Sequence, residues 1–175
     1  MTPMNQPHQR GYPQQGRGGG GPPGPEKVEQ LWPDYLSGGY FDADGCLKVE
    51  YVSREAGQPQ EKPYGVEPLV RAMCEDRNGL TSHQIRRYFG HCRTVETRLK
   101  SGASWGSVLA DIKKLDMAAA DGSGKKPPKI PALFHDFIQK NVAAIKTKED
   151  FLRGFLPHFE ALIGFGTIHF KKERS

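Results

Sequence analysis

The stretch that decides the fold is residues 80–100, LTSHQIRRYFGHCRTVETRLK. Its apolar side chains recur three or four residues apart, which places them on one face of an α-helix. These side chains are Ile85, Tyr88, Phe89, Cys92, Val95 and Leu99. Thr81 or Ser82 stands just before the pattern, where a hydroxyl caps a helix by accepting a backbone N–H hydrogen bond. The stretch therefore predicts an amphipathic helix that runs to about Lys100.

Four more segments have helical spacing. Residues 67–77 form a short helix that Asn78-Gly79 ends, and Ser104 begins a longer one that stops before the loop DGSGKKPPK. Pro131 suits the first turn of the next helix. Thr147 and Asp150 form a capping box for the last one, which Pro157 should kink because proline has no N–H to donate. Together these segments predict an all-α bundle of about five helices over residues 64–165.

The sequence before the bundle has a different character. Seven Gly and six Pro fall within the first 25 residues, so we expect residues 1–30 to be a disordered tail. Residues 31–63 predict an extended or β-hairpin arm and linker, with Asp44-Gly45 as the turn. Residues 166–175 are expected to be a C-terminal tail.

Charge is divided unevenly along the chain. Residues 1–78 hold eight Lys/Arg against eleven Asp/Glu, whereas residues 79–175 hold seventeen against nine. A basic domain of this kind attracts a polyanion such as RNA. Arg86, Arg93 and Lys100 line one flank of the 81–100 helix, Arg87, His91 and Arg98 line the other, and few acids interleave to pair with them. The candidate nucleic-acid-binding residues are Arg86, Arg87, Arg93, Arg98, Lys100, Lys113, Lys114, Lys125, Lys126 and Lys129.

Patterns typical of catalysis and of metal binding are weak. Three cysteines without CxxC spacing and scattered histidines favour neither a zinc site nor a disulfide framework. Asp42 and Asp44 resemble the start of a calcium loop, but the later ligand positions are occupied by the wrong residues. Gly124-Lys125-Lys126 lacks the rest of a phosphate loop. We expect no enzyme activity and no cofactor, and without a signal or an apolar run of ~20 residues we expect a cytoplasmic protein with no membrane contact.

Two quoted segments resemble a known family. Residues 80–89, LTSHQIRRYF, are similar to the "LTxxQIRK" opening of the small subunit of type III-A (Csm-type) CRISPR effector complexes. Residues 145–151, IKTKEDF, and 159–163, FEALI, resemble the family's close in the same order. The likeness covers about residues 64–165. Residues 115–121, LDMAAAD, depart from the family's "LAYAxAR", and with the added N-terminal segment they suggest a divergent type III subtype.

The resemblance implies a non-catalytic subunit of an antiviral-defence ribonucleoprotein. Such a subunit stacks in several copies beside the backbone and large subunits and contacts guide RNA and target RNA. Arg86 and Arg87 match the basic positions of the family motif, so the resemblance assigns them to RNA contact. The assignment of the other cations to RNA contact depends only on the distribution of charge.

Three other interpretations compete with the CRISPR subunit. A helical protein–protein adaptor without RNA binding would direct its basic face at acidic partners. A DNA-binding helix-turn-helix protein lacks grouped side chains for base edges. A nuclease lacks a metal cluster.

Overall fold

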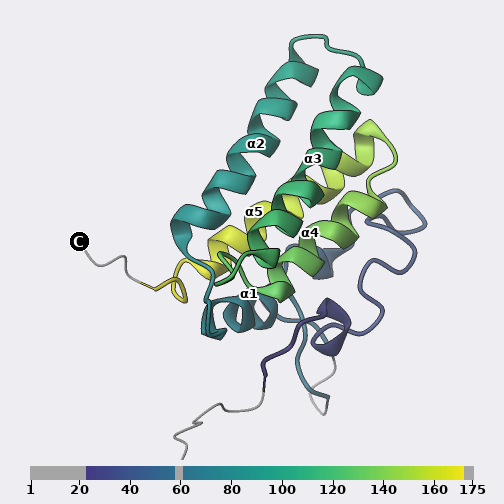
Figure 1. Ribbon diagram of the computed structural model, residues 1–175. Coiled ribbons are helices and arrows are strands. Elements are labelled where there is room, and N and C mark those ends of the chain that lie inside the picture. The colour runs from purple at the N-terminus through teal and green to yellow at the C-terminus, as the bar shows by residue number, and fades with distance from the viewer. Residues whose placement is uncertain (1–22, 58–60, 172–175) are drawn as a thin grey trace, which may run out of the picture.

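The computed structural model describes residues 23–57 and 61–171 (Figure 1). In this part of the chain the five α-helices are α1 (Val66–Glu75), α2 (Ser82–Lys100), α3 (Trp105–Gly124), α4 (Ala132–Ala144) and α5 (Leu156–Gly166). A π-helical stretch, η3 (Asp150–Phe155), leads directly into α5, and two short 3-10 turns, η1 (Val28–Gln30) and η2 (Val49–Tyr51), precede the bundle. The predicted all-α class is confirmed. The predicted disorder of residues 1–22 lies outside the described residues.

The helix starts follow local capping chemistry. At the start of α2, Thr81 Oγ1 accepts the Gln84 N–H (3.2 Å) and Gln84 Oε1 accepts the Thr81 N–H (2.9 Å), which completes a capping box. Ser104 caps α3 by accepting the Ser107 N–H. Thr147 and Asp150 exchange the same pair of hydrogen bonds at the start of η3. Pro131 is the residue before α4 rather than a member of its first turn.

Helix α3 extends through the glycine-containing stretch that the sequence assigned to a loop. It ends at Gly124, so Asp121 and Gly122 are helical. Gly122 is buried, and a Cβ at this position would lie 3.2 Å from both Ile130 Cγ1 and Tyr88 Oη. Contacts with Ile130 and Tyr88 offset the tendency of glycine to weaken a helix. Helix propensity, which is a local property of the chain, does not include these contacts.

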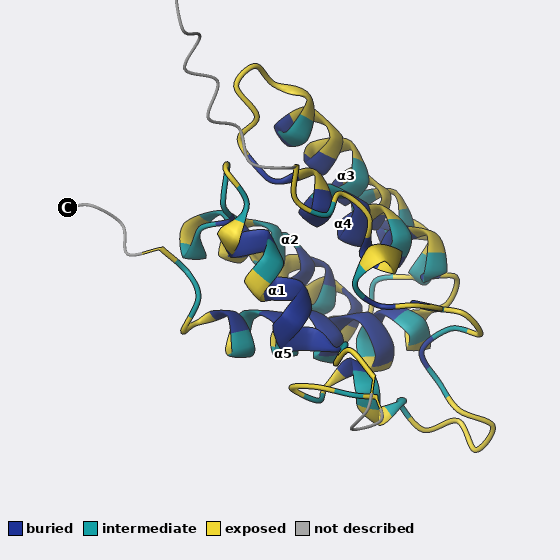
Figure 2. Cartoon of the chain, turned by 90° about the horizontal axis from the view of Figure 1, so that it is seen from below, coloured by how far each residue is buried: buried dark blue, intermediate teal, exposed yellow. Residues whose placement is uncertain are grey.

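The helices pack as a bundle around one core. α2 and α3 run side by side as a helical hairpin, α4 packs on α3, and α5 packs on α1 and α2 (Figure 1). Figure 2 shows buried residues on the inner faces and exposed residues outside. Aromatic rings dominate the centre, where Phe137 lies 6.1 Å from Phe134 and 5.7 Å from Phe159 between ring centroids.

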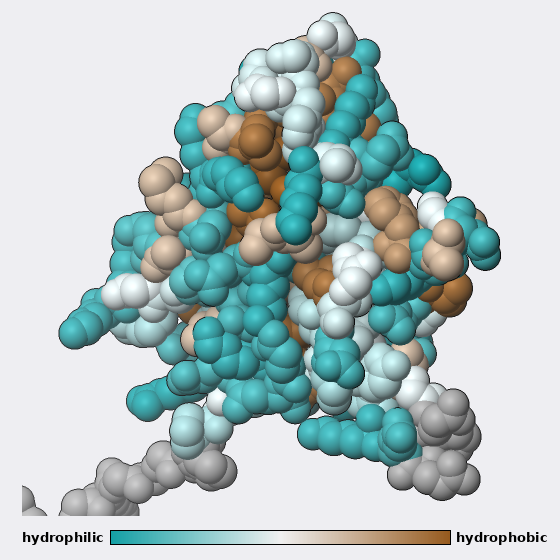
Figure 3. Space-filling model, turned by 90° about the vertical axis from the view of Figure 1, so that its right-hand side faces the viewer, coloured by the Kyte–Doolittle hydropathy of each residue, from teal (hydrophilic) through white to brown (hydrophobic). Residues whose placement is uncertain are grey.

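The surface seen from the right-hand side of Figure 1 is mostly hydrophilic, with hydrophobic residues scattered among the hydrophilic ones (Figure 3). Among the described helices, none has the length and apolar character needed to cross a bilayer.

The segment before α1 belongs to this core. Val28, Trp32, Tyr35, Tyr40 and Tyr51 are each no more than 6% exposed and lie in the same hydrophobic cluster as the helices. The expected tail through residue 30 is therefore corrected, because Val28–Gln30 form a 3-10 turn and Val28 is buried. The expected arm packs on the bundle as a layer. The physical reason is that large aromatic side chains are stabilised by burial, and the bundle supplies an apolar face. The C-terminal end behaves similarly, since Phe170 packs against the core.

The turn within this layer has the expected hairpin character. Phe41 and Leu47 form an isolated antiparallel bridge around the Asp44-Gly45 turn, with Gly45 at a positive φ of 76°. Asp42 Oδ1 accepts the backbone N–H groups of Asp44 (3.0 Å) and Cys46 (2.9 Å). The Asp42 carboxylate thus stabilises a turn, which is the ordinary use of aspartate in loops.

A buried polar network joins the N-terminal layer to α4 and α5. His158 Nδ1 donates to the Tyr51 carbonyl oxygen (2.7 Å), so its Nε2 accepts from the Tyr35 hydroxyl (2.7 Å). Asn141 Nδ2 donates to that same Tyr35 oxygen, and Asn141 Oδ1 accepts from the Tyr40 hydroxyl, both at 2.8 Å. Every member has a partner, so the network orders the layer without leaving an unsatisfied group.

This network makes stability depend on pH. Burial lowers the pKa of His158 to about 4, below its ordinary value of 6.5. The unfolded chain therefore binds a proton that the folded chain excludes, and stability present above pH 6.5 is lost as the pH falls toward 4. We expect a loss of about 3 kcal/mol in unfolding free energy over this window. Urea unfolding at pH 7.0, 6.0, 5.0 and 4.0 measures it, and an unchanged midpoint between pH 7 and 5 would contradict it.

The last helix is irregular just ahead of Pro157. Within η3 the chain bonds at π spacing, and the Leu156 N–H reaches the Phe151 carbonyl oxygen five residues back. The sequence predicts a kink at Pro157. The structure departs from regular α-helix geometry in the π-helical stretch η3, which ends two residues before this proline. π-turns and prolines are both known sites where a helix departs from regular geometry. η3 also contains Gly154, whose bare backbone faces the ring of Tyr40.

Candidate nucleic-acid interface

A groove lies between α2, α3 and the segment that follows α3. We call it the α2–α3 groove. From α2 it is lined by His83, Gln84, Arg87, Tyr88 and His91, from α3 by Lys114, Leu115, Met117, Ala118, Asp121 and Gly122, and beyond α3 by Lys125, Lys129 and Ile130. Its volume is about 400 Å³. Four cationic side chains and one carboxylate surround it, so the groove attracts a negatively charged ligand.

The groove gathers four of the ten predicted site residues. Arg87 comes from α2, Lys114 from α3, and Lys125 and Lys129 from the connection to α4. All four are exposed. In the described part of the chain, no carboxylate forms an ion pair with Arg87 or Lys129. These two cations therefore have their charge available for a ligand.

Most of the other predicted cations have partners within the chain. Arg93 pairs with Glu96 (2.6 Å) and with Glu160 of α5, and its guanidinium lies over the Phe89 ring at 5.0 Å. Lys100 also pairs with Glu96 (2.7 Å). Hydrogen bonds from Lys100 and Arg93 hold the pKa of Glu96 below its ordinary value. This flank of α2 is thus largely neutralised within the chain.

The same holds at the far end of the hairpin. Arg98 pairs with Asp111 of α3, and Lys114 bonds the other oxygen of that carboxylate (2.9 Å). The Lys114 hydrogen bond and charge, followed by those of Arg98, lower the pKa of Asp111. Lys113 turns toward α4, where its Nζ donates to the Val142 carbonyl oxygen (2.9 Å).

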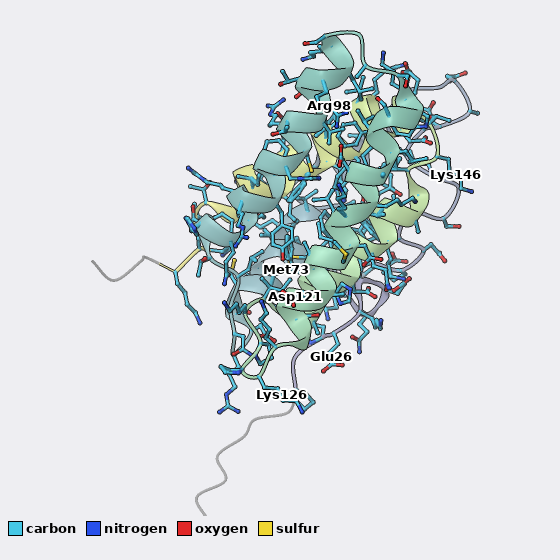
Figure 4. All side chains as sticks on the ribbon, turned by 45° about the horizontal axis from the view of Figure 1, so that its top comes forward. Glu26, Met73, Arg98, Asp121, Lys126 and Lys146 are labelled. Atoms are coloured by element: carbon cyan, nitrogen blue, oxygen red, sulfur yellow. The ribbon has the colours of Figure 1, made fainter. Side chains whose placement is uncertain are left out.

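Arg86 and Lys126 are exposed and lie outside the groove lining. Arg86 is next to Arg87 on α2, and Lys126 follows Lys125 in the connection to α4. Figure 4 places Arg98 and Lys126 toward opposite ends of the α2–α3 pair, with Asp121 between them. The predicted cations are therefore spread along the hairpin, and the groove near Asp121 is where several of them meet.

The expectation that few acids interleave with these cations is wrong for the folded chain. Asp111 and Glu160 stand 13 and 67 residues away in sequence from the arginines that they bind. Helix packing brings them into contact, which a count along one helix cannot detect. Exposed pairs of this kind contribute little stability, but they reduce the charge offered to a polyanion.

Sequence reasoning missed several groove residues. His83, Tyr88, Met117 and Ala118 line the groove, and Met117 is 67% exposed. Of these four, His83 could have been found from the sequence, because His83, Arg87 and His91 follow each other at four-residue steps on one helix face. His91 is fixed there by a hydrogen bond from Nε2 to the Asp111 carbonyl oxygen (2.7 Å). Among the described residues, no group of three or more His, Cys, Asp and Glu is placed to hold a metal ion.

Asp121 lowers the positive charge of the groove. Its carboxylate pairs with Lys125 (2.6 Å) and remains 65% exposed. Replacing Asp121 by Asn removes this charge and releases Lys125, so we expect RNA affinity to rise by roughly 3–10-fold at low salt. Fluorescence anisotropy with a labelled single-stranded RNA measures the change. Asp44→Asn removes the same charge from the N-terminal layer, and an equal gain there would show that only net charge matters.

The fold and the groove together define a small all-α protein with a recess lined by basic side chains. Residues 70–172 match the family model described as Csm2 Type III-A, which covers more than half of the chain, and the protein belongs to this family. The family comprises the structural small subunit of type III-A CRISPR effector complexes. No match was found among curated proteins or among solved structures.

Proposed function

We propose that this subunit lines a type III CRISPR effector ribonucleoprotein and contacts guide RNA and target RNA through the α2–α3 groove. In this role it has no catalytic activity of its own and acts in the cytoplasm. Its partners are the backbone and large subunits of the complex and further copies of itself. Family membership supports the place in the complex, and the surface charge supports the RNA contact.

One observation carries the RNA contact. The groove gathers Arg87, Lys114, Lys125 and Lys129 from three chain segments around a single exposed carboxylate. Elsewhere on α2, Arg93, Arg98 and Lys100 form ion pairs with acids of the same chain. Two of these four, Arg87 and Lys129, form no ion pair within the described part of the chain. A surface kept basic only for solubility would have no reason to gather cations from three segments around one recess. Phosphate groups of an RNA backbone would neutralise them.

The test is to tag the chain in its own host, recover it gently and sequence the RNA that accompanies it. We expect short RNAs that share a common 5′ segment joined to variable inserts, because these features identify guide RNAs. A matched sample carrying Arg87→Glu and Lys129→Glu should recover less of this RNA while keeping the protein subunits. Recovery of protein partners without any RNA, from the unmodified chain, would instead favour a helical adaptor.

A further inference from the structure

We propose that the α2–α3 groove holds one unstacked nucleotide of the bound RNA, with the base in the recess and the phosphate at its cationic rim. This inference rests on the proposed function and deepens it by naming what the groove receives. A helix surface that contacts only a phosphate backbone needs exposed cations. It has no need of a recess.

The recess exists because α3 presents small residues toward α2. Ala118 is exposed, and one turn later Gly122 lets Tyr88 and Ile130 approach the backbone of α3. The resulting space of about 400 Å³ falls in the range of roughly 300–1,000 Å³ typical of small-ligand sites. Leu115 and Ile130 add apolar lining to this space. A floor of this kind suits the flat face of a base better than a hydrated phosphate.

Tyr88 is held in place before any ligand arrives. Its hydroxyl donates to the Ala118 carbonyl oxygen (3.1 Å), and its ring packs edge-on against Phe134 at 5.2 Å between centroids. The side chain is only partly buried, so part of it remains open to the groove. Aromatic side chains commonly stack on unpaired RNA bases. A ring that is already fixed loses little conformational entropy on binding.

The rim supplies the matching charge. Arg87 from α2 and Lys125 and Lys129 from the connection to α4 are exposed residues of the same lining. An apolar floor beneath cations is the combination that a nucleotide requires, because its base is largely apolar and its phosphate is anionic. The geometry therefore fits a nucleotide unit better than either phosphate or an apolar ligand alone.

The experiment follows the full-length protein by ¹H–¹⁵N NMR during titration with AMP and, separately, with ribose 5-phosphate. We expect AMP to bind at least about tenfold more tightly, since stacking adds to the phosphate contact. The shifted amides should cluster at Arg87, Tyr88, Ala118 and Gly122. The Ala118→Phe variant fills the recess without changing its charge and should lose this preference. The Ala120→Phe variant alters an exposed alanine of α3 outside the groove lining and should keep it.

Binding of a single-stranded A20 RNA, measured in parallel, separates the two proposals. If the RNA binds but AMP and ribose 5-phosphate bind equally, or AMP shifts amides elsewhere, the nucleotide recess is refuted and the RNA-contact proposal stands. If Ala118→Phe keeps the preference for AMP, the recess is refuted as well. If the RNA does not bind at low salt, the proposed function itself fails. Circular dichroism confirms that each variant is folded.

Discussion

Replacing Arg87, Lys125 and Lys129 together by glutamate should weaken RNA binding by at least about 100-fold at low salt. The three side chains would lose phosphate contacts worth roughly 1 kcal/mol each, and their new charges would repel the backbone. The dependence of log affinity on log salt should become shallower by about 2–3 because fewer counterions are released. Fluorescence anisotropy between 50 and 200 mM salt measures both effects.

A matched control makes this result specific. Lys62, Lys146 and Lys148 are exposed lysines outside the groove lining, and changing all three to glutamate alters the net charge by the same amount. In Figure 4 Lys146 lies at the right-hand edge of the molecule, away from Asp121 near its centre. We expect the control to lose much less affinity than the groove variant. Equal losses would mean that binding follows net charge and that the groove has no special part. Both variants change exposed residues, so thermal unfolding should stay close to that of the unmodified protein.

The second large effect concerns Gly154, where the N-terminal layer meets the bundle. A Cβ at Gly154 would lie 2.5 Å from Tyr40 Cγ, closer than packed atoms tolerate. Gly154→Ala should therefore push the Tyr40 ring out of place and lower the unfolding free energy by about 1–3 kcal/mol. The midpoint of thermal unfolding should fall by about 2–10 °C. Because Trp32 is only 1% exposed, release of the layer should also shift tryptophan emission to the red.

Gly164→Ala is the control for this substitution. Gly164 lies in α5, and a Cβ added there would have no other group within 4 Å, so alanine fits. The substitution should raise stability by up to about 1 kcal/mol, because alanine favours a helix more than glycine does. If Gly154→Ala proved as stable as Gly164→Ala, the packing of Tyr40 on η3 would be contradicted.

The helical elements could be predicted because their signals are local. The apolar spacing from Ile85 to Leu99 and the capping residues Thr81 and Ser104 act within one or two turns. The end of α3 could not be predicted, since Gly122 is kept helical by contacts with Tyr88 and Ile130. Local propensity favours a break at such a glycine, and distant packing overrides it.

The candidate site was predictable only in part. The basic character of α2 and of the residues after α3 was evident, and both supply cations to the groove, Arg87 and Lys129 among them. Which cations remain unmatched was not evident. Glu160 is 67 residues from Arg93, and only the packing of α5 on α2 brings the two charges together.

The helices, their capped starts and the overall excess of positive charge follow from the chain's order of residues, because each depends on neighbours in the chain. Packing of the helices was needed to place Trp32 and Tyr40 in the bundle core, to bury His158 uncharged at neutral pH, and to open a recess beside Ala118. Burial, ion pairing and hollow space arise between segments far apart in sequence. They exist only once the helices have packed.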